Sequence, residues 1–144
     1  MQYNNCIYST DTFATLMQER GVRPTMQRIE VLSVVANGRK HPSADEIYSG
    51  ISTAVRPQSK TTIYNSLAVL VQCGLLRMLE IESGCVRYDF ALLSDHSHFI
   101  CRKCARIYDF PLPEGFGTSP STNFNIESVN LVYRGLCPQC MQSN

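Results

Sequence analysis

The sequence has 144 residues, of which 44% are hydrophobic and 17% charged, and a formal net charge of +1. This composition argues against disorder and predicts one full domain or two small ones. The longest apolar run, Leu67 to Val71, is too short to cross a bilayer, and the polar opening MQYNNCIYSTD is unlike a secretory signal. We therefore expect a cytoplasmic protein with no membrane partner.

The spacing of apolar residues predicts four helices in the first half of the chain. Their expected caps are Asp11, Thr25, Ser43 and Ser59. Ser43-Ala-Asp-Glu46 has the pattern of a capping box. Two alternating segments, residues 76–82 and 85–90, then predict a β-hairpin around a glycine-containing turn. Helices followed directly by a hairpin are the order of a winged helix-turn-helix domain.

The fourth helix is the candidate DNA-reading element. Its first turns present a mostly uncharged polar face, formed by Lys60, Thr61, Thr62, Tyr64 and Asn65. Amide, hydroxyl and aromatic groups near a helix N-terminus suit the major groove. An ordinary amphipathic helix with a polar face is the alternative interpretation, and the hairpin that follows favours the DNA-binding one.

Basic residues are concentrated in the same half of the chain. Residues 20–60 contain seven Lys or Arg against three Asp or Glu, whereas residues 85–144 contain five of each. The candidates for phosphate contacts are Arg20, Arg23, Arg28 and Lys60. From charge alone, a solvated surface is the favoured interpretation of this distribution.

Seven cysteines in a chain without an export signal favour metal binding over disulfides. Four of them form two Cys-x-x-Cys pairs, Cys101 with Cys104 and Cys137 with Cys140. Two such turns can supply the four sulfurs of a closed, structural zinc site, which has no open position for a substrate. A redox dithiol and two chance pairs are the competing interpretations, and the matching spacing favours zinc.

A second set of candidate ligands surrounds the first of these pairs. His96 and His98 alternate in an extended segment, so both imidazoles point to one side of it. Asp89 and Asp109 add carboxylates, and this mixture of donors suits an exchangeable Fe²⁺, Mn²⁺ or Zn²⁺ ion. Polar residues near a domain junction are an equally good interpretation from the residues alone.

The second half of the chain has strand-like patterns at residues 98–101, 105–110, 124–127 and 130–134. A stretch rich in Gly, Ser, Thr and Pro from residue 114 to 123 predicts a loop. The predicted fold class is therefore α/β (α+β), with a winged-helix domain at residues 1–91 and a second domain at residues 92–144.

Several motifs together resemble those of the ferric uptake regulator family of bacterial metal-responsive repressors. They are GVRPTMQR, HPSADEIY, KTTIYNSL, RYDF, SDHSHFIC-x-x-C, IYDF and the final C-x-x-C, spanning about Asp11 to Cys140. The resemblance implies a winged-helix DNA-binding domain joined to an α/β dimerisation domain. It implies a homodimeric, metal-dependent repressor that binds a palindromic, AT-rich operator in double-stranded DNA and is not an enzyme.

The resemblance also assigns two ligand sets. The structural zinc would be held by Cys101, Cys104, Cys137 and Cys140. The regulatory ion, Fe²⁺ or Mn²⁺ with Zn²⁺ as an alternative, would be held by His41, Asp89, His96, His98 and Asp109. His41 and Asp89 would come from the DNA-binding domain, so that the bound ion fixes the angle between the domains.

Two features resemble the peroxide-sensing branch of the family. Asp89 and Asp109 stand where iron-uptake repressors usually carry Glu, and Asn65 follows Tyr64 where they usually carry Arg. In peroxide sensors, Fe²⁺ reacts with H₂O₂, a ligand histidine is oxidised and the repressor leaves DNA; His41 and His96 would be the residues oxidised here. No other small-molecule substrate is expected. An iron-, zinc- or manganese-uptake regulator is the alternative within the family.

Two departures from the family pattern carry expectations of their own. The stretch from Gly115 to Ser121 stands where relatives have a helix that supports the dimer. Residues 125–130 replace a His-rich segment, so a further metal site is expected to be absent. Outside the family, a metalloenzyme using the His/Asp residues and a zinc-stabilised interaction module remain the alternatives.

Overall fold

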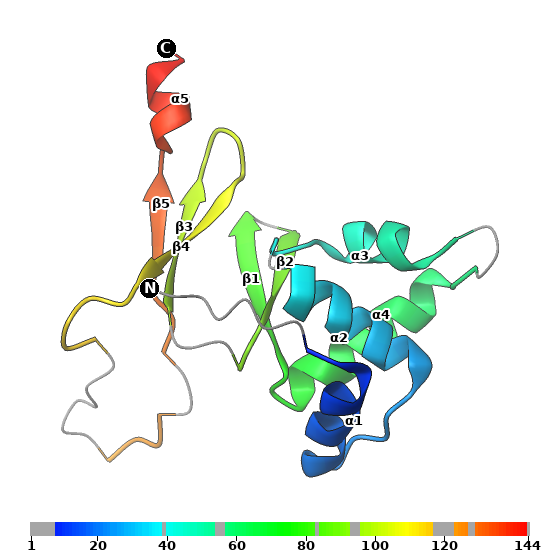
Figure 1. Ribbon diagram of the computed structural model, residues 1–144. Helices are drawn as coiled ribbons and strands as arrows, with labels where there is room; N and C mark the ends of the chain where they lie inside the picture. The colour runs from blue at the N-terminus through cyan, green and yellow to red at the C-terminus, as the bar shows by residue number, and fades with distance from the viewer. Residues whose placement is uncertain are drawn as a thin grey trace. The chain divides into compact units, whose positions relative to one another are not determined.

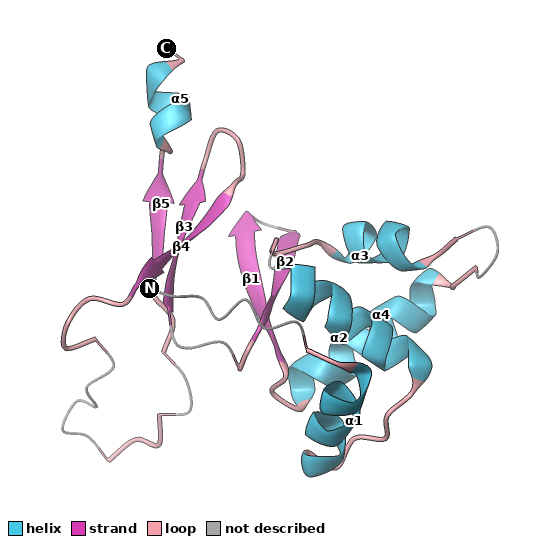
Figure 2. Cartoon of the chain, viewed as in Figure 1, coloured by secondary structure: helices cyan, strands magenta, loops and turns pink. Residues whose placement is uncertain are grey.

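The structure, a computed structural model, describes residues 8–38, 40–53, 57–82, 84–92, 96–116, 123–126 and 129–143 (Figure 1). The chain divides into two compact units, residues 2–93 and residues 94–144. The N-terminal unit consists of four helices and a hairpin, and the C-terminal unit of a three-stranded sheet and a short helix (Figure 2).

The four helices of the N-terminal unit begin where short polar side chains can cap them. They are α1 (Thr10–Glu19), α2 (Met26–Gly38), α3 (Ala44–Ile51) and α4 (Lys60–Gln72). Ser59 caps α4 by accepting from the Thr62 N–H, and Ser43 caps α3 in the predicted capping box. The prediction for α1 is wrong in detail: Ser9, not Asp11, is the N-cap, because its hydroxyl accepts from the Thr12 N–H.

One apolar core joins the helices to the hairpin. Strands β1 (Leu76–Glu82) and β2 (Cys85–Phe90) pair antiparallel, with Gly84 at a positive φ of 80° in their turn. Phe90 of β2 packs in the same cluster as Phe13 and residues from α2, α3 and α4. Burial of one such side chain is worth about 1.5–3 kcal/mol. The helices followed by this wing confirm the predicted winged helix-turn-helix.

The C-terminal unit is a small sheet with strand order β4-β3-β5. Its elements are β3 (His96–Cys101), β4 (Ile107–Pro111), β5 (Val132–Gly135) and α5 (Pro138–Gln142). Strand β4 pairs antiparallel with β3, whereas β5 pairs parallel with it. Helix α5 was not predicted, although Pro138 directly after Cys137 is a helix-start signal.

The strand predicted at residues 124–127 is wrong for the part that is described. Residues 123–126 form a bend and loop, and Phe124 is 83% exposed. Alternation stabilises a strand only where one face is buried, and this segment buries neither. Of the stretch Gly115 to Ser121, residues 115 and 116 form a turn, and residues 117–121 lie outside the described residues. No helix occurs in the described part of residues 112–131.

Candidate metal centres and DNA-reading helix

The four paired cysteines lie together at one end of the sheet. Cys101 ends β3, Cys104 follows in a tight turn, and Cys137 and Cys140 belong to the start of α5. Their sulfur atoms all lie within 4.8 Å of one another. Zinc–sulfur bonds of about 2.3 Å give a tetrahedron with edges of about 3.8 Å. The Cys104 and Cys137 sulfurs are 3.8 Å apart, so the residues fit a zinc ion.

Backbone geometry shapes this cluster. Ala105 adopts a positive φ of 59° and its N–H donates to the Cys101 carbonyl at 2.9 Å, which closes the first turn. The Cys137 N–H lies 3.4 Å from the Cys101 sulfur and joins the two turns. Backbone N–H groups of Cys104 and Cys137 lower the pKa of Cys101 to about 6, because they stabilise its thiolate.

The two sulfurs of the second turn differ in their surroundings. The Cys140 N–H is the main cause of a lowered pKa at Cys137, and the Tyr108 hydroxyl adds to it. Burial raises the pKa of Cys140 to about 12. A raised pKa means that Cys140 keeps its thiol proton in the absence of metal. A bound zinc ion would displace this proton, because zinc binds the thiolate. Tyr108 was missed in the sequence; its position two residues before Phe110 in IYDF gave no signal for a contact with a cysteine.

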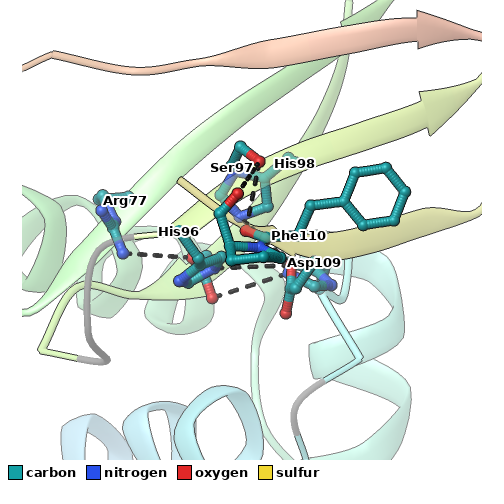
Figure 3. Close-up of polar contacts among 9 residues, drawn as sticks. Arg77, His96, Ser97, His98, Asp109 and Phe110 are labelled. Carbon is teal, nitrogen blue, oxygen red and sulfur yellow. Dashed lines mark hydrogen bonds and ion pairs between the residues drawn. The ribbon is translucent and has the colours of Figure 1, made fainter. Parts of the chain in front are cut away.

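A second cluster lies within the sheet of the C-terminal unit. His96 and His98 are on β3, and Asp109 is opposite His98 on β4. Asp109 Oδ1 is 3.5 Å from His96 Nε2 and 3.6 Å from His98 Nε2 (Figure 3). Ser97, between the histidines, uses its hydroxyl to donate to the Phe110 carbonyl at 3.2 Å. The alternation of β3 therefore brings two imidazoles and one carboxylate together, a donor set that fits a divalent transition metal.

The N-terminal unit contains the remaining two predicted ligands side by side. His41 Nε2 lies 3.8 Å from Asp89 Oδ1, and both residues are buried. Arg77 faces Asp89 across the hairpin, and its Nη2 lies 3.5 Å from Asp89 Oδ2. Sequence reasoning missed Arg77; the strand register would have revealed it. His41 has a φ of 48°, which costs on the order of 1 kcal/mol for a residue with a Cβ.

The candidate reading helix presents most of the predicted residues to solvent. Thr61 and Asn65 of α4 are exposed, and Tyr64 is 51% exposed. Lys60 is exposed and lies 3.8 Å from Asp45. Thr62 differs from the others, because its hydroxyl is 2.7 Å from the Ser59 hydroxyl at the helix cap.

The predicted phosphate contacts divide in a similar way. Arg23 is exposed. Arg28 is half-buried and donates to the Arg23 carbonyl at 2.7 Å, and Arg20 donates to the Leu16 carbonyl at 3.3 Å. In this structure, Arg20 and Arg28 therefore stabilise the ends of their own segments, while Arg23 is available to solvent.

The sequence model of the ferric uptake regulator family matches residues 19–134. The chain belongs to the ferric uptake regulator family. This confirms the family and fold class expected from the motifs. Members of this family are metal-dependent, DNA-binding transcription regulators, and the four-cysteine and His/Asp clusters of this chain fit that assignment. Among the residues that the structure describes, no helix has the length and apolar character needed to cross a bilayer.

The chain is similar to members of two branches of the ferric uptake regulator family and shares its fold with solved structures. The peroxide operon regulator of Bacillus subtilis (strain 168) is 35% identical over 129 residues, covering 86% of this chain and 88% of that protein. The ferric uptake regulation protein of Synechococcus elongatus is 32% identical over 143 residues, covering 94% and 97%. The solved structure of the Helicobacter pylori ferric uptake regulator Fur has a TM-score of 0.73 at 22% identity, covering 94% and 95%.

Proposed function

We propose that this protein is a homodimeric repressor that binds a palindromic, AT-rich operator while it holds a regulatory cation, and that hydrogen peroxide releases it. The observation that carries the proposal is the donor set: two imidazoles meet one carboxylate in the C-terminal unit, and His41 lies beside Asp89 in the N-terminal unit. Aspartate at both carboxylate positions and the similarity to the Bacillus subtilis protein favour the peroxide-sensing branch.

In this proposal the two units have separate tasks. Residues 1–91 bind DNA and residues 92–144 form the dimer and hold zinc at Cys101, Cys104, Cys137 and Cys140. The regulatory cation takes His41 and Asp89 from the first domain and His96, His98 and Asp109 from the second. An ion held by both domains restricts their angle, and that angle sets the spacing of the two reading helices in a dimer.

Iron(II) held by these residues supplies the redox chemistry by which peroxide is reduced and an oxygen atom is added to a ligand imidazole. His41 and His96 are the residues we expect to be modified. A modified imidazole is a poorer ligand, so the domains lose their shared ion and with it the DNA-binding geometry. The protein is consumed in this reaction and does not turn over.

DNA reading is assigned to the exposed residues of α4. Tyr64 and Asn65 carry the groups that reach base edges, with Thr61 and Lys60 beside them. Arg23 is the best placed of the arginines for phosphate, because Arg28 is engaged with a backbone carbonyl. Thr62, also predicted to contact DNA, contributes to the cap of α4 through its hydroxyl contact with Ser59.

The deciding experiment measures binding to a palindromic AT-rich duplex by fluorescence anisotropy, with Mn²⁺ or Fe²⁺ under anaerobic conditions, before and after peroxide. We expect the protein to bind the duplex with either metal before peroxide is added. After peroxide, we expect only the iron-loaded protein to lose this binding. A mass gain of about 16 Da in a peptide containing His41 or His96 should accompany the loss. A scrambled duplex is the control.

The other possible results of this experiment would each support a different function. Iron-loaded protein that stays on DNA after peroxide would be a metal-uptake regulator, the alternative favoured by the similarity to the Synechococcus elongatus protein. Protein that binds neither duplex at low salt would have no DNA function, since phosphate contacts must give a salt-dependent affinity.

A further inference from the structure

The connector that carries His41 is fastened to strand β2 by the backbone. The Tyr88 N–H donates to the Pro42 carbonyl at 3.0 Å. Pro42 directly follows His41, and Tyr88 directly precedes Asp89. This hydrogen bond therefore lies directly beside the pair His41 and Asp89, whose Nε2 and Oδ1 atoms are 3.8 Å apart.

A side-chain contact between Glu46 and Arg87 also links the segment after His41 to strand β2. Arg87 Nη1 lies 2.9 Å from both carboxylate oxygens of Glu46. Glu46 is also the N3 residue of the capping box, where its Oε2 accepts from the Ser43 N–H at 3.1 Å. One carboxylate thus binds the start of α3, which follows the His41 connector, and β2, which contains Asp89.

His41 needs such a restraint more than most residues do. Its φ of 48° is in the left-handed region, which a residue with a Cβ adopts only where its surroundings impose it. The backbone hydrogen bond to Pro42 and the Glu46–Arg87 contact both restrain the segment that follows His41. Arg87 is 22% exposed and Glu46 56% exposed, so solvent screens this ion pair in part, and its bidentate geometry and its link to the helix cap distinguish it from an isolated surface pair.

We infer that the Glu46–Arg87 ion pair is a positioning device for the regulatory site: it holds His41 opposite Asp89 and thereby sets the affinity for a divalent cation. The inference rests on the proposed function, because it takes His41 and Asp89 as ligands of that cation. In this assignment neither Glu46 nor Arg87 is a ligand of the cation. They act through the segment that they fasten.

Helix α3 offers a matched control next to Glu46. Asp45 is the other acidic residue in its first turn. Asp45 Oδ1 lies 3.8 Å from Lys60 Nζ, and the two side chains are 74% and 63% exposed. This second ion pair joins α3 to α4 and not to β2. Asp45→Asn and Glu46→Gln therefore remove the same charge from the same helix turn, and only Glu46→Gln loosens β2.

The experiment measures Mn²⁺ binding to the zinc-loaded dimer by the electron paramagnetic resonance signal of free Mn²⁺. Glu46→Gln keeps the capping box, because Gln can also accept from the cap N–H. We expect it to weaken Mn²⁺ binding about tenfold, the lower end of the effect of residues that orient metal ligands. Asp45→Asn should bind Mn²⁺ as the wild type does, and zinc content should be equal in all variants.

Arg87→Met and the double variant show whether the two residues act as a pair. If they do, the double variant Glu46→Gln/Arg87→Met has an Mn²⁺ affinity no lower than that of the single variant with the lower affinity. Arg87→Lys, which keeps the charge, should recover part of the affinity lost in Arg87→Met. The absorption spectrum of Co²⁺ at the site should change in Glu46→Gln and not in Asp45→Asn. Should Glu46→Gln fail to fold, Arg87→Met and Arg87→Lys carry the same comparison.

Two negative results have different meanings. Wild-type affinity in Glu46→Gln and Arg87→Met, or additive losses in the double variant, would overturn the inference and leave the proposed function intact. If the zinc-loaded wild-type protein binds no Mn²⁺ at all, the proposed function itself would be overturned.

Discussion

In the N-terminal unit, apolar side chains from all four helices and the hairpin meet in one core. The core cluster of the C-terminal unit is different, because its buried residues are Cys101, Cys137 and Cys140, with Phe99, Tyr108 and Leu136 packed against them. The first unit can fold by removing apolar surface from water. The second has a smaller apolar core, so an ion bound by its four sulfurs, as proposed, would contribute much of its stability.

This difference teaches that the two metal sets have different tasks. In the proposed function, zinc bound to the cysteine cluster would be part of the fold of one unit. The His/Asp residues, by contrast, lie on β3, β4, the His41 connector and β2, elements that are held by backbone pairing and by the N-terminal core. An exchangeable ion is compatible with such positions, since its loss leaves those elements in place.

The largest effect is expected from Cys137→Ser. Structural zinc contributes an apparent free energy of about 10 kcal/mol or more in small zinc domains, so this variant should lose zinc and the ordered sheet β3–β5, while the N-terminal unit stays folded. Amide signal dispersion in NMR spectra and the zinc content report the two outcomes. Cys73→Ser, at a half-buried thiol outside the cluster, is the control. If the sheet stays ordered in zinc-free Cys137→Ser, the C-terminal unit does not depend on zinc for its fold, and the proposed difference between the two units is wrong.

The converse variant is Leu32→Ala in α2. Leu32 is fully buried in the N-terminal core, and truncation at such a site costs about 2–5 kcal/mol in free energy of unfolding. Thermal and urea unfolding should show this loss, with zinc content unchanged. Loss of zinc on Leu32→Ala would mean that the two units do not fold independently.

A smaller effect is expected for His41→Ala, which removes a proposed ligand from the N-terminal unit. Cation affinity and metal-dependent operator binding should fall about tenfold or more, whereas zinc content and the unfolding midpoint stay close to those of the wild type. Equilibrium Mn²⁺ binding and fluorescence anisotropy with duplex DNA measure this. Unchanged operator affinity would remove the proposed link between the domains.

The smallest effect concerns the start of α1. Ser9→Ala should cost about 1 kcal/mol in free energy of unfolding, because it removes the acceptor of the Thr12 N–H. Asp11→Asn, which changes only a charge in the first turn, should cost less. Urea unfolding of both variants tests the corrected cap, and a larger loss for Asp11→Asn would restore the cap predicted from the sequence.

The sequence predicted those features that depend on local spacing. The capping box of α3, the Ser59 cap of α4 and the alternation of the hairpin are all read from residues a few positions apart. Each Cys-x-x-Cys turn is also local, whereas the meeting of the two turns was inferred from the four-sulfur chemistry of zinc and not from spacing. Family motifs supplied His41, which nothing in its own loop distinguishes.

Features that depend on partners distant in sequence were missed. Arg77 contacts Asp89 only because the hairpin register places them opposite each other. The contact of Arg87 with Glu46 joins residues 41 positions apart. The strand pattern at residues 124–126 failed for the opposite reason: the local alternation is present, and the exposure of Phe124 and Ile126 shows that no buried face stabilises it.

Strand β3 carries proposed ligands of both ions, with His96 and His98 at its beginning and Cys101 at its end. Any lesion that frees Cys101 from zinc therefore acts on the strand that presents the imidazoles. Oxidation of the thiols beyond the sulfenic level is irreversible, so in the proposed function it would lastingly disturb the strand that presents the imidazoles, whereas exchange of the regulatory cation is reversible.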